Sequence, residues 1–193
     1  MPRYNFAQTQ GQSCGAVCAM VTLAELGTTA PASINVATEM QIWQNVWRGN
    51  GPSESPVAYV SNFFLGNGRQ SQFYEDQGRI GNLMDAMPAM VAPYMTHREE
   101  LVSTGLAGQV SPLLPEHFAN NARILLVVII AGVGLTHYVL ARQENGGIWV
   151  MNPDGGQDTQ QADLFAWVNG PAGGVANIGG VNYIFTGIFV RVV

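Results

Sequence analysis

Apolar residues recur every three or four positions through the first third of the chain, as they do along helices that pack against a core. The first such stretch predicts a helix over 14–26, with Ser13 as its N-cap. A second helix is expected over 34–47, capped by Ser33, and a shorter third helix over 55–65. We therefore expect the N-terminal part of the chain to be helical.

The pattern changes to strand-like runs in the second half. Residues 123–131 form a continuous apolar run rich in β-branched residues, which is typical of a strand buried on both faces. Residues 136–143 and 148–151 flank the sequence Glu-Asn-Gly-Gly and predict a hairpin, and residues 181–192 predict a final strand. The remaining expected elements are a strand over 69–75, helices over 79–94, 96–106, 115–122 and 162–168, and a mobile glycine-rich loop over 170–180. The helix over 79–94 is expected to be interrupted or ended near Pro88 and Pro93.

These elements predict an α+β fold in which a helical N-terminal half packs on an antiparallel sheet formed by the C-terminal half. The chain shows no internal repeat and no dividing linker, so we expect a single domain over 1–193. With 193 residues, 47% of them hydrophobic, the chain can fill the core of such a domain. Intrinsic disorder over most of its length is excluded.

Charge and hydropathy narrow the range of partners. The formal net charge of −5, from 8 basic and 13 acidic residues, offers no attraction for the phosphates of nucleic acid. The longest apolar run, over 124–135, has 12 residues. A helix needs about 20 residues to cross a bilayer. We therefore expect neither nucleic-acid binding nor membrane insertion.

The basic residues are all arginine, and lysine is absent although it is one of the commonest residues in ordinary proteins. A protein that must avoid lysine-directed modification, such as a bacterial toxin or effector inside a eukaryotic cell, would show this bias. The first residues lack the apolar stretch of a cleavable signal peptide. We therefore expect secretion by a route without a signal peptide, into a host or target cell, with residence in the cytoplasm as the alternative.

Two cysteines fall in the first predicted helix. Cys14 opens that helix, where the helix dipole and the free backbone N–H groups favour a thiolate; the alternative is a buried core cysteine. Cys18 lies one turn further along, and we expect it in the core. Cysteines four residues apart on a helix have poor disulfide geometry, and two ligands do not complete a zinc site. Neither a disulfide scaffold nor a zinc site is expected.

A thiolate nucleophile needs a base, which at neutral pH is usually histidine. His97 lies in a charged stretch and His117 in a short helix, so we expect a surface role for the first and a structural role for the second. His137 instead opens a strand after a glycine-bearing turn, where a side chain faces both a cleft and a core. The predicted hairpin returns Asn152 and Asp154 to its neighbourhood, and each offers an acceptor for the imidazole N–H.

Residues 8–20, Gln-Thr-Gln-Gly-Gln-Ser-Cys-Gly-Ala-Val-Cys-Ala-Met, resemble the nucleophile segment of the papain-like cysteine peptidases. The segment is most similar to the bacterial branch that contains bacteriocin leader peptidases, and it also resembles plant-pathogen effector proteases. In that family a glutamine six residues before the cysteine donates to the oxyanion hole. The resemblance assigns this role to Gln8, with the backbone N–H of Cys14 as the second donor. Gln10 and Gln12 are rival donors.

The family's second segment is a histidine that opens an apolar strand, then a turn, a second strand, and an Asp or Asn followed by proline. His137, the strand over 148–151 and the pair Asn152-Pro153 follow this order. The resemblance therefore implies a papain-like fold, with Asn152 as the residue that orients His137 and Asp154 as its alternative. The spacing of the two cysteines departs from the family, because it is one residue longer than in papain.

These residues favour a papain-like cysteine hydrolase, and within that class an endopeptidase that acts as a bacterial effector or toxin. Cys14 would attack a carbonyl carbon, His137 would shuttle the proton and Asn152 would orient His137. The expected partners are a protein or peptide substrate and, for a toxin or effector, an inhibitor or immunity protein. No metal or organic cofactor is implied.

Two alternatives stay open on the sequence alone. The same triad forms an acyl-enzyme from a side-chain amide in a glutamine deamidase or transglutaminase, or from a cell-wall amide in a peptidoglycan amidase. The other alternative is a non-enzymatic binding module on the same fold, with a partner surface formed by Trp43, Trp47, Phe63 and Phe64. Ordinary thiol reactivity of Cys14 would favour this module over the enzymes.

Overall fold

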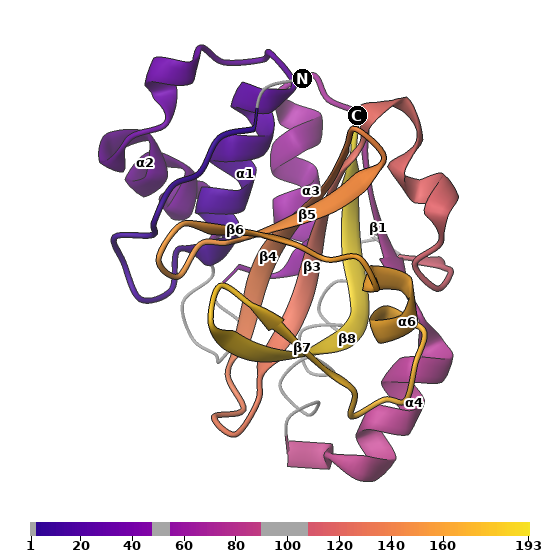
Figure 1. The fold of residues 1–193 in the computed structure, drawn as a ribbon. Coiled ribbons are helices and arrows are strands. Elements are labelled where there is room, and N and C mark those ends of the chain that lie inside the picture. Colours follow the sequence, from indigo (N-terminus) through magenta and orange to yellow (C-terminus); the bar gives the residue numbers. More distant parts are fainter. Residues whose placement is uncertain (1–2, 48–54, 90–107) are drawn as a thin grey trace.

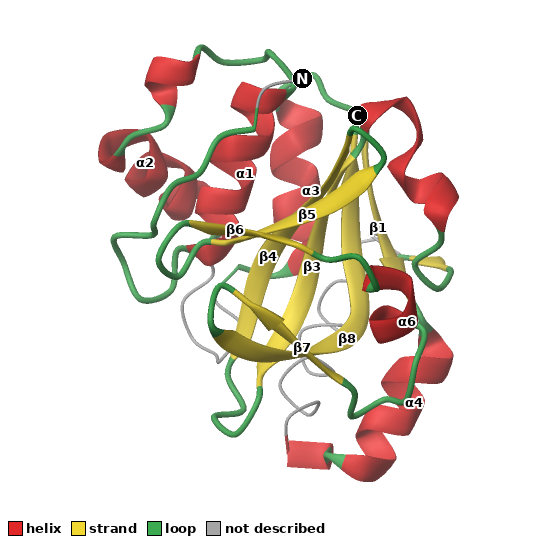
Figure 2. Ribbon diagram, in the orientation of Figure 1, coloured by secondary structure: helices red, strands yellow, loops and turns green. Residues whose placement is uncertain are grey.

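The computed structural model describes residues 3–47, 55–89 and 108–193. Its helices and 3₁₀ segments are α1 (Cys14–Glu25), η1 (Pro31–Ser33), α2 (Val36–Val46), α3 (Val57–Gly66), α4 (Gln77–Ala86), η2 (Pro115–Asn121) and α6 (Leu164–Val168). Its strands are β1 (Ser71–Glu75), β2 (Gln109–Val110), β3 (Arg123–Ile130), β4 (Thr136–Glu144), β5 (Gly147–Asn152), β6 (Gln157–Gln160), β7 (Val175–Ile178) and β8 (Val181–Val192). The fold is α+β, as expected (Figure 2).

The strands form one mixed sheet in the order β2-β1-β8-β3-β4-β5-β6, and β7 also pairs with β8. Strands β1 and β2 are parallel, and the other neighbouring pairs are antiparallel. The prediction of an antiparallel sheet formed by the C-terminal half is therefore confirmed only in part: β1 comes from the N-terminal half, and its pairing with β2 is parallel. Strand β8 is long enough to pair with β7 near its start and with β1 near its end, and local patterns do not reveal such distant pairing.

The alternation of side chains along β3 divides the interior into two cores. Leu125 and Val127 pack into a core shared with α1, α2 and α3, which Figure 1 shows gathered on one side of the sheet. Leu126 and Val128 pack into a second core shared with α6 and η2. The run of apolar residues thus forms a strand buried on both faces, as predicted.

Helix α1 lies at the centre of the first core. All twelve of its residues are buried, which fits a sequence that is apolar around the whole helix apart from Thr22 and Glu25. Helices α2 and α3 and strand β4 contact it. The position of its first residue, Cys14, is therefore fixed by packing along the whole helix.

The helix starts differ from expectation. Ser13 occupies the N-cap position of α1, but its hydroxyl binds Glu39 on α2 instead of capping the helix. Helix α2 is capped by Asn35, whose side chain accepts the backbone N–H of Thr38, and the predicted cap Ser33 lies in η1. Ser13 is therefore the N-cap of α1 by position, as predicted, although its side chain makes no capping hydrogen bond. The predicted cap Ser33 was wrong, because Asn35 caps α2.

The glycine-rich segment over 170–180 is not simply a loop. Residues Val175–Ile178 form β7, which turns into β8 through Gly179 and Gly180, both at positive φ. Strand β6 was also not predicted, because its residues are polar and show no apolar alternation.

Two of the predicted helices lie partly or wholly outside the residues that the structure describes. The helix expected over 79–94 is α4, which ends at Ala86 shortly before Pro88. Its remainder from residue 90, and the helix expected over 96–106, lie outside the described residues. Across the part of the chain that the structure describes, every helix is too short or too polar to span a bilayer.

Candidate active site

Cys14 is the first residue of α1 and is 9% exposed. Its sulfur accepts a hydrogen bond from the backbone N–H of Tyr138 on β4, over 3.4 Å. The helix approaches β4 this closely because Gly15 has no side chain. A Cβ there would lie 3.3 Å from Cδ2 of Tyr138 and 3.1 Å from Cβ of Ser55. The packing of Gly15 thus fixes the thiol beside the start of β4.

His137 is the second residue of β4, and its Nε2 lies 2.9 Å from Oδ1 of Asn152 at the end of β5. Strands β4 and β5 pair antiparallel, which returns the end of β5 to the start of β4 as the hairpin predicted. Because Oδ1 is an acceptor, Nε2 carries the proton in this contact. Nδ1 is then left for the Cys14 thiol, with which the imidazole also forms a hydrogen bond.

Asp154, the alternative to Asn152, does not hold the imidazole through its side chain. Its backbone N–H donates to Oδ1 of Asn152 over 3.0 Å, so this oxygen accepts from both neighbours. The Asp154 residue is exposed, and its negative charge makes the smallest of the contributions that raise the pKa of His137. Of the two sequence candidates, Asn152 is the one in contact with His137.

For the thiol and for the imidazole, burial and the interaction between the two groups shift the pKa in opposite directions. Burial by itself would raise the pKa of Cys14, but the charge of His137, their hydrogen bond and the N–H groups of Tyr138 and Gly15 outweigh it and leave that pKa lowered. Burial would lower the pKa of His137, but the charge and hydrogen bond of Cys14, together with Asn152, leave it raised. The pair therefore favours a thiolate beside an imidazolium.

Gln8 reaches the same place from the N-terminal segment. Its backbone N–H donates to the carbonyl of Pro153 over 2.8 Å, directly after Asn152. This close approach requires Gly156, where a Cβ would lie 2.7 Å from the backbone nitrogen of Ala7. The side-chain oxygen of Gln8 is buried without a hydrogen-bond partner. The loop after β5 thus positions both the imidazole partner and the segment that carries Gln8.

These residues surround a cavity of about 370 Å³. Its lining includes four of the five predicted site residues, together with polar and apolar neighbours: Gln8, Gly11, Gln12, Cys14, Ser55, Ile130, Leu135, Thr136, His137, Tyr138 and Asp154. Gln12 lines it and stays a rival donor, whereas Gln10 accepts the N–H and hydroxyl of Ser13 with its backbone carbonyl. The Cys14 side chain therefore borders a cavity that has both polar and apolar lining residues.

Two residues near the site were not found from the sequence. The ring of Tyr183 on β8 stacks on the His137 imidazole, with centroids 5.5 Å apart and planes 9° apart. Burial raises the pKa of Tyr183 to about 12, so it stays neutral. Ser55 lines the cavity with a buried hydroxyl that has no hydrogen-bond partner. No local motif marks either residue, because each reaches the site from a distant segment.

The other cysteine and the other described histidine lie outside the site. Cys18 is completely buried, and burial raises its pKa well above the ordinary range, which confirms it as a core residue. Nδ1 of His117 accepts the backbone N–H of Leu114, and its ring packs edge-on against Phe189. His117 is therefore structural, as expected. His97 lies outside the described residues.

The aromatic residues considered as a partner surface divide between core and surface. Phe64 is fully buried, and Phe63 and Trp43 are half-buried against the same core. Trp47 is 40% exposed, with its ring 5.8 Å from that of Trp43. Only part of the expected surface therefore faces solvent.

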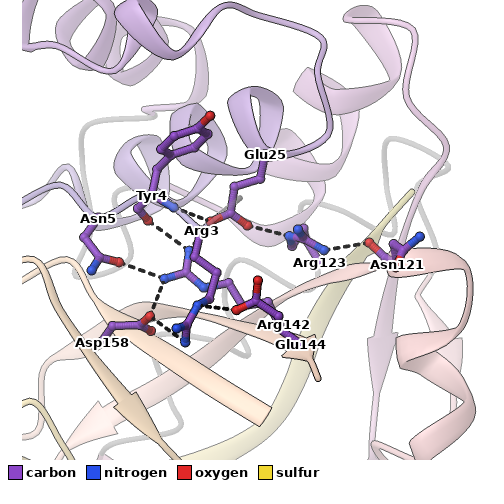
Figure 3. A network of polar contacts seen from close by, with 9 residues as sticks. All are labelled: Arg3, Tyr4, Asn5, Glu25, Asn121, Arg123, Arg142, Glu144 and Asp158. Atoms are coloured by element: carbon purple, nitrogen blue, oxygen red, sulfur yellow. Dashed lines mark hydrogen bonds and ion pairs between the residues drawn. The ribbon is translucent and has the colours of Figure 1, made fainter. Parts of the chain in front are cut away.

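The far end of α1 carries a buried ionic network (Figure 3). Glu25 accepts from the backbone N–H of Tyr4 at 2.9 Å, from Arg123 and from Arg142. Arg142 also contacts Asp158 over 3.0 Å and donates to the carbonyl of Tyr4. The network joins α1, β3, β4 and the N-terminal segment.

Among the described residues, no group of three or more His, Cys, Asp or Glu side chains is arranged to hold a metal ion. Neither a scan against protein-family models nor a search of curated proteins gives a match for this chain. The geometry of Cys14, His137 and Asn152 is therefore the basis for a functional assignment.

Proposed function

We propose that this protein is a papain-like cysteine hydrolase, and that it acts as an endopeptidase. The observation that carries the proposal is the arrangement of three residues: the Cys14 sulfur accepts the N–H of Tyr138, next to His137, and the His137 imidazole is hydrogen-bonded to Asn152. A thiol at a helix start, an imidazole that holds its proton and an amide that fixes the ring are the parts that nucleophilic catalysis by cysteine requires.

The proposed reaction starts from the thiolate–imidazolium pair. The Cys14 sulfur attacks the carbonyl carbon, a C–S bond forms and the carbonyl π electrons move to oxygen. The side-chain amide of Gln8 and the backbone N–H of Cys14 stabilise this oxyanion. When the intermediate collapses, the C–N bond breaks and the leaving amine takes the proton from His137. The product of this half-reaction is a thioester on Cys14.

Water completes the cycle. The now neutral imidazole of His137 takes a proton from water as the oxygen attacks the thioester carbon. Collapse of the second intermediate releases the carboxylic acid and returns the thiolate beside the imidazolium. Throughout, Asn152 keeps the ring in one orientation through its carbonyl oxygen.

The order of the elements supports a papain-like architecture. A buried helix carries the cysteine at its start, and a later antiparallel hairpin carries the histidine and asparagine. Gln8 precedes the helix and borders the same cavity. The absence of lysine supports the further proposal that the protein works as an effector or toxin after secretion into a target cell, where an inhibitor or immunity protein would be a partner.

The test is incubation with a library of peptides of known sequence, followed by mass spectrometry. We expect the wild-type protein to produce pairs of fragments whose masses sum to a substrate plus one water. Cys14→Ala should produce none, and the matched variant Cys18→Ala should cleave like the wild type because Cys18 is a core residue. A mass gain of about one dalton without fragments would replace peptide cleavage by side-chain deamidation. If no peptide of the library changes in mass, the result would contradict the proposal that the protein is an endopeptidase.

A further inference from the structure

A buried carboxylate other than that of Glu25 lies beside the candidate site, and it has no role in the proposed triad. Glu39, in the first turn of α2, is completely buried. Its Oε1 accepts from the backbone N–H of Thr9 at 2.8 Å and from the hydroxyl of Ser13 at 2.5 Å. Its Oε2 accepts from the hydroxyl of Thr9 at 2.8 Å. One side chain thus binds both ends of the short segment that leads into α1.

The two bound residues are the direct neighbours of the proposed oxyanion donors. Thr9 follows Gln8, and Ser13 precedes Cys14, so the peptide group that supplies the Cys14 N–H begins at Ser13. The segment between Gln8 and Cys14 belongs to no helix or strand. The distance between Gln8 and Cys14 is therefore not fixed by the backbone hydrogen bonds of a helix or a strand.

The chemistry of the contact suits a carboxylate. Three donors converge on Glu39, and an ionised carboxylate is an acceptor at both oxygens. Hydrogen bonds to a charged acceptor are shorter and stronger than neutral ones, and a negative charge in the first turn of α2 also interacts favourably with the helix dipole. These effects offset the cost of burying the charge.

We propose that Glu39 is a positioning residue, which holds Thr9 and Ser13 so that the Gln8 side chain and the Cys14 N–H converge on one oxyanion. This inference rests on the proposed function. Glu39 does not touch the reacting atoms, and it acts through the segment between Gln8 and Cys14. Its removal should weaken stabilisation of the oxyanion and leave the thiolate–imidazolium pair intact.

Two reactions of Cys14 separate these effects. Alkylation by iodoacetamide needs the thiolate and forms no oxyanion. Acylation by a peptide substrate needs the thiolate and also passes through an oxyanion that must be stabilised. For Glu39→Ala we expect kcat to fall about 10- to 100-fold, with KM and the alkylation rate within about twofold of wild type. A peptide aldehyde, which forms a thiohemiacetal with an oxyanion, should bind more weakly by a factor similar to the loss in kcat.

Conservative and matched variants sharpen the test. Glu39→Gln keeps an acceptor for Thr9 N–H and Ser13, and its amide can donate to the Thr9 hydroxyl, so kcat should return to within about fivefold of wild type. Gln41→Ala, at an exposed position of the same helix, should leave kcat and alkylation unchanged. If Glu39→Ala does not fold, Ser13→Ala and Thr9→Val each remove one hydroxyl contact and should show the same selective loss in kcat, at smaller size.

The possible results have distinct meanings. Turnover and alkylation that fall in parallel would overturn the proposal, because Glu39 would then support the whole site. Unchanged turnover in Glu39→Ala, or in both hydroxyl variants where that protein does not fold, would overturn it as well. A wild-type Cys14 that alkylates like an ordinary thiol and turns over no peptide would instead refute the proposed function, independently of Glu39.

Discussion

The two ends of helix α1 both hold buried charge, but they hold it differently. At the first residue, Cys14 borders a cavity of about 370 Å³, and the charge of His137 contributes to lowering the pKa of its thiol. At the last residue, Glu25 is enclosed by Arg123, Arg142 and the backbone of Tyr4. One end leaves the charged atom accessible, and the other surrounds it with protein donors.

We therefore expect the Cys14 end to determine reactivity and the Glu25 end to determine stability. A buried charge that is fully paired is costly to disturb, because removal of one partner leaves the others unpaired. The Glu25 end has this property, and it binds four chain segments together. At the Cys14 end the residue borders a cavity, where the proposed reaction would form a bond to the sulfur. Substitutions at the two ends should therefore affect different measurements.

The largest effect is expected from Cys14→Ala. Turnover should fall by at least about 10⁴-fold, because the nucleophile is lost. The free energy of unfolding should change by less than about 1 kcal/mol, since the sulfur borders a cavity and leaves little new void. Peptide cleavage and urea unfolding measure the two quantities. A Cys14→Ala protein that still turns over, or that unfolds far more easily, would remove the contrast between the two ends.

Glu25→Gln should show the opposite behaviour. It leaves Arg123 and Arg142 buried without their shared carboxylate, so we expect a loss of about 3–5 kcal/mol in the free energy of unfolding. Turnover per folded molecule should stay within about threefold of wild type. Urea titration and kinetics at low denaturant measure both. A loss below about 1 kcal/mol would mean that the network adds little stability.

Asn152→Ala should have a smaller effect on turnover. The imidazole would lose its contact at Nε2 and part of its orientation, so kcat should fall by about 10- to 100-fold. Steady-state kinetics measures this change, with circular dichroism as a control for folding. Turnover equal to that of wild type would exclude Asn152 as the orienting residue.

The smallest effect is expected from Asp154→Asn, the matched change two residues later. Its side chain contributes only charge, so kcat should stay within about twofold of wild type. The pKa of His137 should decrease slightly, because a nearby negative charge is removed. The alkaline limb of the pH–rate profile reports this shift. A loss as large as that of Asn152→Ala would reverse the assignment of the two residues.

The parts of the site that the sequence predicted are local. Cys14 and His137–Asn152 lie in a helix start and a hairpin, and each can be recognised from neighbouring residues. Glu39 and Tyr183 were missed, because their roles come from packing between segments that are distant in the sequence. The same physical reason explains why α1, α2 and α3 were predicted and the edge strands β2 and β6 were not.

Misassigned details follow a related rule. Ser13 is the N-cap of α1 by position, but its hydroxyl donates to the buried Glu39 and the side chain makes no capping hydrogen bond. The segment over 170–180 contains enough glycine to predict a loop, yet the long edge of β8 offers backbone partners that order residues 175–178. In both cases a tertiary partner outweighed the local preference.

The most direct test of the central claim is the pH dependence of Cys14 alkylation by iodoacetamide, measured by intact mass in wild type and His137→Ala, each with Cys18→Ala. The account predicts one label, with a midpoint below that of an ordinary cysteine thiol, because the imidazolium lowers the pKa of the thiol. In His137→Ala the reaction should slow and its midpoint should rise, since burial then acts without the opposing charge. The same ordinary thiol profile in both proteins would contradict the account and make Cys14 a structural residue.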